Sequence, residues 1–367
     1  MEKQPRVVIS GGGTGGHIFP AISIANAVKE LRPDAEILFI GAENRMEMEK
    51  VPAAGYPIVG LPVSGFDRKN MFNNVQVIYR LTKSMLKGWF AVRKFRPDVA
   101  VGVGGYASGP TLRIASMQGV PTLLQEQNSY AGVTNKILAK NAAKICVAYD
   151  KMERFFPKDK IILTGNPVRQ DLFTKEDKRA EAVEYFQLDP AKKTILVVGG
   201  SLGARTVNQS IIAKLAAISE SDVQVIWQTG KYYFEDAEAT LKTVNPNNVH
   251  LTAFISRMDL AYAVADLIIS RAGAGSISEF CLLGKPVILV PSPNVAEDHQ
   301  THNAQALTTK NAAVMIKDVD AKEQLVDAAL SLINQPEKMA DLGKNILLLA
   351  QHDSAKRIAE EVLKLIK

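Results

Sequence analysis

A glycine-rich segment that ends in a histidine stands near the start of the chain. The apolar run Val7 to Ile9 is typical of a strand buried on both faces, and it leads into SGGGTGGH at residues 10–17. Glycines let backbone N–H groups crowd around an anion, and the next helix would point its first N–H groups at the same place. His17 adds an imidazole that titrates near neutral pH. The segment therefore predicts a phosphate-binding loop with a candidate general base beside it.

This segment alone leaves several functions open. Gly11, Gly13 and Gly16 fit the G-x-G-x-x-G pattern of dinucleotide-binding domains, and Glu43, after the predicted strand at 37–40, could hold a ribose. A nicotinamide-dependent dehydrogenase or a nucleotide-binding regulator is one alternative. A strand-to-helix turn that needs glycine only for close packing is another.

Three further segments place small residues after a predicted strand. Glycines recur at 102–109, where Tyr106 and Ser108 could offer hydroxyls to a polar ligand, and again at 199–203. Small residues at 272–276 begin a predicted helix whose N-terminus suits a diphosphate, and Glu279 lies one turn in, where it could accept both hydroxyls of a ribose. With the loop at 11–16, the segments at 102–109 and 199–203 make three glycine loops in one chain, which is improbable as packing alone. We therefore expect a nucleoside diphosphate ligand.

Two polar clusters add candidate catalytic groups. Glu126 and Asn128 follow a predicted strand and could act as base or hydrogen-bond partner, although a satisfied loop network is the alternative. The segment DHQTHN at 298–303 is rich in groups that bind sugar hydroxyls.

Metal sites are not predicted. His299 and His302 have H-x-x-H spacing, but no further ligand set is apparent. Asp318 and Asp320 look like the paired acids of metal-dependent sugar transferases. Asp320 with Glu323 also makes a capping-box pattern, which we favour.

The elements that would position these groups alternate between strands and helices. Apolar runs bounded by Gly or Pro alternate with amphipathic stretches, the rhythm of parallel α/β sheets. Predicted strands lie near residues 7–10, 37–40, 98–103, 121–124, 144–148, 161–164, 194–199, 223–228, 249–252, 266–270, 286–290 and 312–316. We expect two doubly wound units with a hinge at 164–169. Ligands of such sheets bind beyond the carboxyl ends of the strands, so two facing units would enclose a cleft.

Composition bounds the class of protein. The 367 residues are 47% hydrophobic and 22% charged, and no apolar run reaches the length of a membrane span. The first ten residues carry an acid and a proline, unlike a secretory signal. Two cysteines in apolar contexts predict buried free thiols in a reducing compartment. The net charge of +6 favours anionic partners in a general way without selecting one.

Residues 68–97 contain eight basic residues and no acid. A predicted helix there has a core stripe that includes Leu81 and Val92. Beside the core stripe lies a second apolar strip flanked by basic residues, and the candidate membrane contacts on this face are Tyr79, Arg80, Lys83, Leu86, Lys87 and Phe90. Such a face suits an anionic lipid surface, because acyl burial and charge attraction reinforce each other. A solvated helix face is the alternative.

Seven motifs, in this order, resemble those of the MurG-type family of undecaprenyl-diphospho-muramoylpentapeptide β-N-acetylglucosaminyltransferases. They are GGTGGH at 12–17, GGYASGP at 104–110, EQN at 126–128 with AGVTNK at 131–136, GNPVR at 165–169, GGSLGAR at 199–205, RAGAGSISE at 271–279 and DHQTHNA at 298–304. The resemblance runs from residue 7 to beyond 304, which is far more specific than any single glycine loop.

The resemblance implies an α/β fold of the GT-B class, with two Rossmann-like doubly wound parallel-sheet domains facing across a cleft. The implied domains are an acceptor and membrane-associating domain at 1–165, joined by the last helix at 354–367, and a donor-binding domain at 166–353. The implied reaction moves N-acetylglucosamine from UDP-N-acetylglucosamine to the muramoyl 4-hydroxyl of the lipid-linked acceptor, lipid I, with inversion, giving lipid II. The place implied is the cytoplasmic face of the bacterial inner membrane.

Site residues follow from the same motifs. Donor contacts would be Thr14, Gly15, Gly16, Asn128, Arg169, Ser201, Ile255, Ala274, Gly275, Ser276, Ile277, Ser278, Glu279 and Gln300. Ile255 would act through its backbone at the uracil, Arg169 and Ser201 near the diphosphate, and Gln300 at the sugar. Acceptor contacts would be Gly12, Gly13, Gly104, Gly105, Tyr106 and Ser108.

The expected catalytic chemistry needs a base but no cofactor. His17 is the preferred general base, and Glu126 stays open as the alternative. Helix N-termini and Arg169 could stabilise the leaving UDP without a metal. Expected partners are the UDP-sugar, lipid I, an anionic inner-leaflet surface and other cell-wall synthesis proteins, with no nucleic acid.

Two positions depart from the family pattern. Many members have His where Gln125 stands, and some have a second Gln where Thr301 stands. The catalytic role of the first position is not carried over to Gln125, and the second sugar contact is not assigned to Thr301. Within the enzymes, the alternative is another GT-B transferase with a UDP-sugar donor and a different acceptor.

Overall fold

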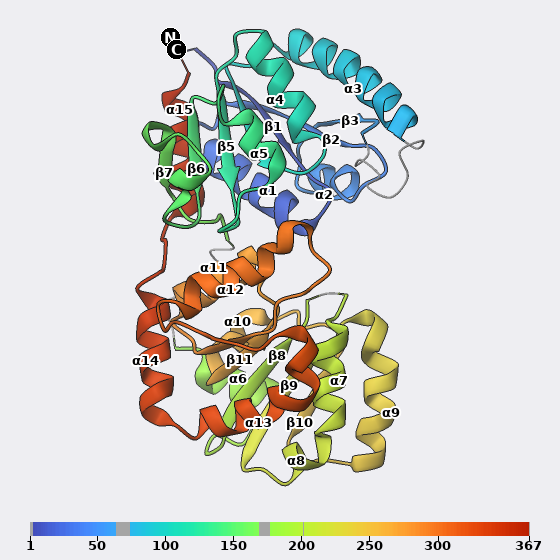
Figure 1. Cartoon of the computed structure of the whole chain (residues 1–367), viewed down its shortest axis with the longest axis vertical. Helices are drawn as coiled ribbons and strands as arrows, with labels where there is room; N and C mark the ends of the chain where they lie inside the picture. Colours follow the sequence, from blue (N-terminus) through green and yellow to red (C-terminus); the bar gives the residue numbers. More distant parts are fainter. Residues whose placement is uncertain (1–2, 64–73, 169–176, 201, 367) are drawn as a thin grey trace. The chain divides into compact units, whose positions relative to one another are not determined.

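The computed structural model describes residues 3–63, 74–168, 177–200 and 202–366, with side chains of helix residues 74–80 not described. The chain divides into two compact units (Figure 1). The first comprises residues 1–168 and 351–367, and the second comprises residues 169–350. Both are built on a parallel sheet.

Within the described residues, the first unit contains a sheet in the order β3-β2-β1-β4-β5-β6-β7. The strands are β1 (Arg6–Gly11), β2 (Glu36–Ala42), β3 (Ile58–Leu61), β4 (Val99–Gly104), β5 (Thr122–Glu126), β6 (Lys144–Val147) and β7 (Ile161–Leu163). Val7 pairs in register with Ile37 on one side and Val99 on the other. The order reverses between β1 and β4, and such switch points are where ligands of open α/β sheets bind.

Helices cover both faces of this sheet. They are α1 (Gly15–Leu31), α2 (Glu47–Ala53), α3 (Asn74–Phe95), α4 (Ser108–Met117), α5 (Val133–Leu138) and α15 (Ser354–Lys364). Alternate β1 side chains point to opposite faces, so Val7 and Ile9 join a core with α1 and α15, whereas Val8 joins a core with α3 and α4. A strand that is buried on both faces needs the continuous apolar run seen in the sequence.

The chain leaves the first unit and returns to it at one place. Gly165 has φ +83°, and a Cβ there would overlap Gln351 and Ser354, so the outgoing and returning segments pack closely. Arg357 of α15 donates hydrogen bonds to the Gln351 side chain (3.1 Å) and to the Leu163 carbonyl (2.6 Å). These contacts attach the last helix to the first unit.

The second unit repeats the architecture. Its described strands have the order β10-β9-β8-β11-β12-β13. They are β8 (Lys193–Val198), β9 (Val223–Gln228), β10 (Val249–Thr252), β11 (Leu267–Ser270), β12 (Val287–Leu289) and β13 (Val314–Met315). The helices are α6 (Arg179–Phe186), α7 (Arg205–Ala213), α8 (Leu215–Ser219), α9 (Phe234–Val244), α10 (Met258–Val264), α11 (Ala274–Leu283), α12 (His299–Thr308), α13 (Ala321–Ile333) and α14 (Pro336–Leu347).

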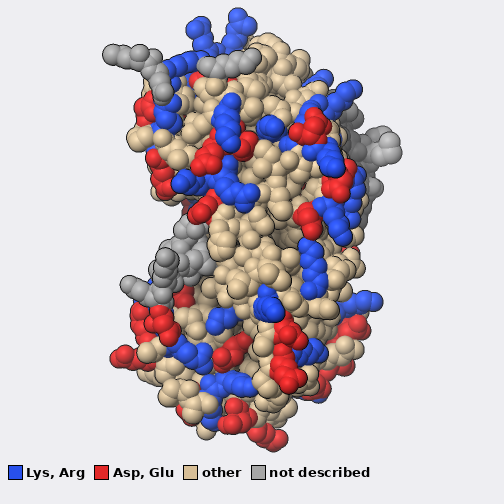
Figure 2. Space-filling model, turned by 90° about the vertical axis from the view of Figure 1, so that its left-hand side faces the viewer, with Lys and Arg blue, Asp and Glu red and all other residues tan. Residues whose placement is uncertain are grey.

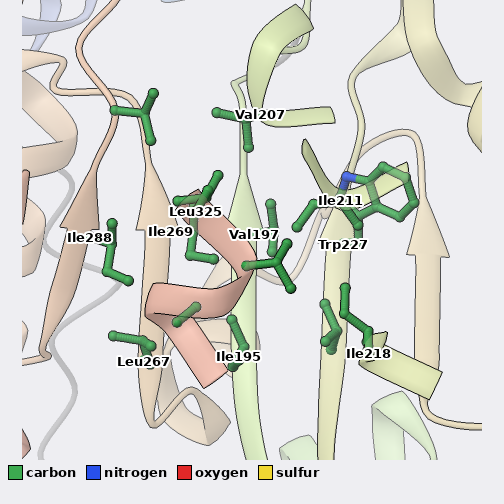
Figure 3. Packing of buried hydrophobic residues seen from close by; sticks show 14 of the residues in the cluster. Ile195, Val197, Val207, Ile211, Ile218, Trp227, Leu267, Ile269, Ile288 and Leu325 are labelled. Carbon is green, nitrogen blue, oxygen red and sulfur yellow. The ribbon is translucent and has the colours of Figure 1, made fainter. Parts of the chain in front are cut away.

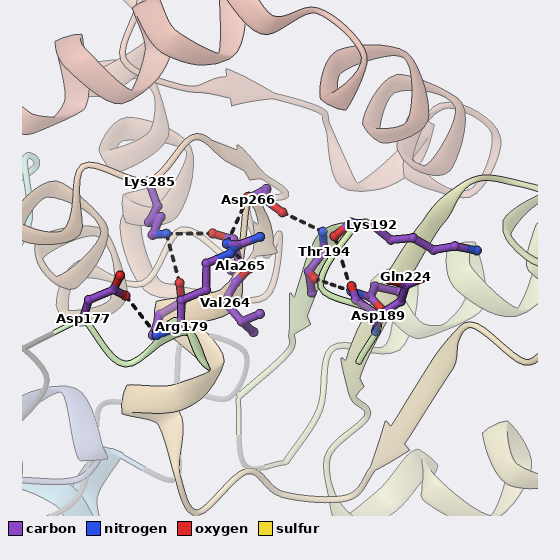
Figure 4. Close-up of polar contacts among 11 residues, drawn as sticks. Asp177, Arg179, Asp189, Lys192, Thr194, Gln224, Val264, Ala265, Asp266 and Lys285 are labelled. Atoms are coloured by element: carbon purple, nitrogen blue, oxygen red, sulfur yellow. Dashed lines mark hydrogen bonds and ion pairs between the residues drawn. The ribbon is translucent and has the colours of Figure 1, made fainter. Parts of the chain in front are cut away.

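Trp227 of β9 is fully buried in the core of this unit (Figure 3). Its indole N–H donates to Asn208 Oδ1 of α7 (3.0 Å), which satisfies the one polar atom of the ring. At the amino ends of the strands, Asp266 accepts hydrogen bonds from Thr194 N (2.7 Å) and Arg179 (3.3 Å) (Figure 4). Polar contacts there anchor α6 to the sheet, at the end away from the glycine loops.

Sequence patterns located every one of these strands except β3. Gly60 interrupts the β3 apolar run, and the strand has only four residues, so its pattern was too short to recognise. The two cysteines, Cys146 and Cys281, are free and buried as predicted, and burial raises the pKa of each thiol to about 12. Of the described helices, none is long and apolar enough to cross a membrane.

Candidate active site

The first two glycine loops meet at the carboxyl ends of β1 and β4. Gly12 N donates to the Gly104 carbonyl (3.2 Å), and a Cβ at Gly105 would overlap the Gly12 carbonyl oxygen. Gly105 also has φ +88°, a conformation that favours glycine. Segments about ninety residues apart therefore form one surface at the switch point of the sheet.

His17 stands on this surface in the first turn of α1. Its Nδ1 lies 3.1 Å from the Gly12 carbonyl oxygen and 3.3 Å from Thr14 Oγ1. A carbonyl oxygen can only accept, so Nδ1 carries a proton, and in the neutral imidazole the lone pair is then on Nε2. The ring packs on Gly104, where a Cβ would lie 2.9 Å from Nε2. This is the tautomer that a general base needs.

Glu47, which the sequence patterns did not single out, lies under the same loop. Its side chain is fully buried, and its carboxylate accepts hydrogen bonds from Gly13 N (3.0 Å) and Ala42 N (2.9 Å). One of the N–H groups expected to hold a phosphate is therefore bound to an internal carboxylate. Glu43, the candidate ribose acid of a dehydrogenase, forms an ion pair with Lys87 (2.7 Å). Neither feature fits a dinucleotide site.

Glu126 is bound within its own loop. Its carboxylate accepts hydrogen bonds from Asn128 N (3.0 Å), Gly132 N (3.0 Å) and Asn135 Nδ2 (2.9 Å), and only 2% of the residue is exposed. A carboxylate with these donors orders the loop and is poorly placed to take a proton from a substrate. The loop-network interpretation of Glu126 is therefore favoured, and Asn128 is held half-buried at the edge of the network.

The predicted acceptor hydroxyls differ in exposure. Tyr106 is 53% exposed beside Gly104 and Gly105, so its hydroxyl can meet a ligand. Ser108 is fully buried, with its hydroxyl directed at Gly102. The Ser108 hydroxyl, predicted to contact the acceptor, is therefore enclosed between the start of α4 and β4 in this conformation.

In the second unit, the predicted diphosphate site lies at the switch point between β8 and β11. Helix α11 begins at Ala274, and its first N–H groups have no acceptor within the helix. Ile277 N donates to the Gly273 carbonyl (3.0 Å), and its side chain is 1% exposed. The Ile277 side chain therefore lies in the core, whereas Ala274, Gly275 and Ser276 lie at the helix N-terminus.

Glu279 is oriented by a residue that the motifs did not reveal. The Tyr262 hydroxyl donates to Glu279 Oε2 (2.8 Å), and its ring packs edge-on against Phe280. Tyr262 is 3% exposed, whereas Glu279 is half-buried. The Tyr262 hydroxyl therefore orients the carboxylate that is predicted to accept from ribose hydroxyls.

Gln228, at the end of β9, joins two loops of the candidate nucleotide site. Its Oε1 accepts from Ile255 N (2.9 Å), and its Nε2 donates to the Gly200 carbonyl (3.1 Å). Because the Ile255 N–H is bound, recognition of a uracil by this backbone would use the carbonyl. No sequence motif marks Gln228 as the residue that joins these two loops, which lie 55 residues apart in the chain.

Gln300 lies in the first turn of α12. Its Oε1 accepts from Ser292 N (2.9 Å), so its amide NH₂ is the group that could donate to a sugar. Asn303, fully buried, donates to the Ala272 carbonyl (3.3 Å) and links α12 to the loop after β11.

The predicted capping box at Asp320 is absent. Asp320 is the N-cap residue of α13, but its side chain forms no capping hydrogen bond because a 3₁₀ turn at Asp318–Asp320 precedes the helix. Asp318 instead pairs with Arg271 and accepts from Thr206 Oγ1 (2.9 Å). Among the described residues, no group of three or more His, Cys, Asp or Glu is arranged to hold a metal ion.

The basic helix α3 has both an apolar and a charged exposed face. Leu86 is 59% and Phe90 68% exposed, and Lys83 is exposed beside them. Val92 is fully buried as expected, but Leu81, predicted in the core stripe, is 38% exposed. Figure 2 shows another face, on which basic and acidic side chains are interspersed.

Some predicted residues lie outside what the structure describes. For the donor site these are Arg169 and Ser201, and for the membrane face they are the side chains of Tyr79 and Arg80.

Comparison with known proteins decides the family. The description of the glycosyltransferase family 28 N-terminal domain matches residues 7–147, and that of its C-terminal domain matches residues 194–362. The chain belongs to glycosyltransferase family 28. The predicted fold class of two doubly wound GT-B domains is confirmed by this match and by the two parallel sheets.

Full-length relatives share the same printed name. A protein of Parabacteroides distasonis is 65% identical over 99% of both chains, and one of Flavobacterium psychrophilum is 52% identical over 100% of this chain and 99% of its own. Each is named UDP-N-acetylglucosamine–N-acetylmuramyl-(pentapeptide) pyrophosphoryl-undecaprenol N-acetylglucosamine transferase. The crystal structure of MurG from Acinetobacter baumannii is 26% identical, with TM-score 0.81, covering 98% of this chain and 99% of that chain.

Proposed function

We propose that this family 28 member transfers N-acetylglucosamine from UDP-N-acetylglucosamine to the muramoyl 4-hydroxyl of undecaprenyl-diphospho-muramoylpentapeptide, with inversion. The observation that carries the proposal is the 65% identity, over 99% of both chains, to a relative named for this donor and acceptor. Each sheet has a switch point, the place where ligands of open α/β sheets bind, and this agrees with a two-substrate transferase.

The donor would bind mainly on the second unit. Its diphosphate would lie at the N-terminus of α11 over Ala274, Gly275 and Ser276, where N–H groups and the helix dipole favour negative charge. Glu279, held by Tyr262, would accept from the ribose hydroxyls. The Ile255 carbonyl would accept from the uracil, and the Gln300 amide would donate to the sugar.

His17 would be the general base. The Gly12 carbonyl holds the proton on Nδ1, so Nε2 is the nitrogen that removes the hydroxyl proton as the hydroxyl attacks the anomeric carbon. Gly15 and Gly16, at the start of α1, would contribute N–H groups to a phosphate beside the transferred sugar. Tyr106 supplies an exposed hydroxyl for the acceptor.

The leaving UDP gains negative charge as the glycosidic bond breaks. We propose that the α11 N-terminus and Arg169 stabilise this charge and that transfer needs no metal. Activity that survives a chelator would support this part of the proposal, and activity restored only by added divalent cation would reject it.

The exposed face of α3 would contact the anionic inner leaflet of the cytoplasmic membrane. Phe90 and Leu86 supply apolar area, and Lys83 supplies positive charge next to them. Lys87 is bound to Glu43, which reduces its share of the attraction. This proposal would place the enzyme where a lipid-linked acceptor is available.

The deciding experiment supplies labelled UDP-N-acetylglucosamine with a lipid I analogue. Label in a product of lipid II mass supports the proposal, and donor binding without transfer to this acceptor would point to a GT-B transferase with another acceptor. Binding of NAD in place of the UDP-sugar would reject both.

A further inference from the structure

We propose that Glu47 is a positioning residue for His17, acting through the single peptide group that lies between them. The inference rests on His17 being the base in the proposed reaction. The Gly12–Gly13 peptide donates its N–H to Glu47 Oε2 (3.0 Å) and accepts the Nδ1 proton of His17 at its carbonyl oxygen (3.1 Å). Carboxylate, peptide and imidazole therefore form one continuous hydrogen-bond chain.

The local packing is arranged around this carboxylate. Glu47 is 0% exposed, and a Cβ at either Gly12 or Gly41 would overlap its side chain. Gly13 takes φ +87°, a conformation that favours glycine, and its N–H donates to the carboxylate (3.0 Å). Two glycines of the sheet edge thus make room for an acid, and a third presents an N–H group to it.

A buried carboxylate is costly unless its oxygens are bound. Here Oε1 binds Ala42 N (2.9 Å), Oε2 binds Gly13 N, and no ion pair forms with any Lys or Arg of the described chain. Because both oxygens are bound by backbone N–H groups and no described Lys or Arg pairs with the carboxylate, its charge can polarise the Gly12–Gly13 peptide and strengthen the carbonyl as an acceptor.

Two effects on His17 follow. The fixed peptide keeps the proton on Nδ1, which leaves the lone pair on Nε2 for the hydroxyl of the acceptor. As Nε2 takes that proton, the ring becomes positive, and the polarised carbonyl and the carboxylate behind it stabilise the imidazolium. Glu47 touches neither substrate, so its effect is confined to turnover.

Glu47→Gln tests this with little change in shape. The amide can accept from only one of the two N–H groups, and its NH₂ would face the other. We expect kcat to fall about tenfold, with the donor KM within about twofold, and the acid limb of the pH–rate profile to move about half a unit lower. Glu49→Gln, the same change at an exposed position of α2, is the matched control and should behave as wild type.

Repeating Glu47→Gln in the His17→Ala background distinguishes an effect of Glu47 on His17 from a general effect on folding. If Glu47 acts through His17, Glu47→Gln should cause no further loss of kcat when His17 is already absent. An equal loss in both backgrounds, or wild-type kcat and pH profile in Glu47→Gln, overturns the inference.

Imidazole ¹⁵N NMR reads the tautomer without any substrate. The chain has five histidines, so His17→Gln identifies the His17 signals by their disappearance. We expect Nδ1–H in the wild type and a rise in Nε2–H in Glu47→Gln, whereas an unchanged tautomer overturns the inference. If that variant does not fold, Glu47→Asp withdraws the carboxylate by one methylene and should show the same change, and a wild-type tautomer there overturns it. Because this measurement needs no turnover, failure of the proposed transferase activity would be recognised separately.

Discussion

Replacing Tyr262 by Phe removes one hydroxyl and tests how the ribose site is built. The hydroxyl donates to Glu279 Oε2 at 2.8 Å, and the ring is fixed by burial and by its contact with Phe280. Phe fills the same space, so the core should not collapse. The variant therefore isolates the orientation of one carboxylate.

The magnitude follows from the kind of hydrogen bond lost. A hydrogen bond to a charged group contributes roughly 1.5–3 kcal/mol. Because Glu279 is only half-buried, we expect the contribution of this bond to lie at or below the lower end of that range. If about 1 kcal/mol of that orients the carboxylate toward ribose, the Kd of UDP should rise about fivefold. The value of kcat should change little, because the ribose is remote from the reacting carbon.

Calorimetric titration with UDP and with its 2′,3′-dideoxy analogue provides the assay. The wild type should prefer UDP, and Tyr262→Phe should reduce that preference while leaving the affinity for the dideoxy analogue unchanged. Tyr185→Phe, at an exposed tyrosine of the same unit, is the control. If both nucleotides weaken equally, or neither does, Tyr262 does not act through ribose recognition and the reasoning is refuted.

Three further predictions concern the first unit. His17→Ala should keep the donor Kd near the wild-type value while kcat falls roughly 10²-fold, and unchanged turnover would remove His17 as the base. Gly105→Ala adds a Cβ at φ +88° and against the Gly12 carbonyl, so urea denaturation should show a free energy of unfolding lower by about 2–4 kcal/mol. The control Gly55→Ala, at φ +86° in open space, should lower it by only about 1 kcal/mol, and equal losses would contradict the loop contact. Lys83→Glu should weaken binding to anionic vesicles about tenfold or more at low salt, with Lys338→Glu of the second unit as control, and identical partitioning of the two variants would argue against a role for Lys83 in the membrane contact.

The sequence predicted the repeated elements of the fold because they depend on local pattern. Apolar runs of strand length followed by glycine marked all strands but β3, and the helix start at Ala274 followed from the small residues after β11. Glycine loops also marked the carboxyl ends of β1, β4 and β8, where a parallel sheet binds ligands. Position along the chain was therefore enough to indicate the candidate binding sites.

Polar partners could not be predicted in this way. Glu126 and Ser108 looked available from their place after a strand and before a helix, but the fold buries both. Conversely, Tyr262 and Gln228 stood in ordinary helix and strand patterns and proved to hold Glu279 and Ile255. The burial of a side chain and its hydrogen-bond partners depend on residues that are distant in sequence and meet in the fold. The spacing of residues along the chain does not predict them.

The segment SGGGTGGH shows the same division. The sequence by itself determined a glycine turn, a helix start and an imidazole at its first turn. Only the tertiary structure decided that Gly12 and Gly13 join His17 to the buried Glu47, thirty residues away along the chain. A glycine's missing side chain leaves room for either an anion or a neighbouring residue, and which of the two fills the space depends on the packing of β2 and α2 beside it.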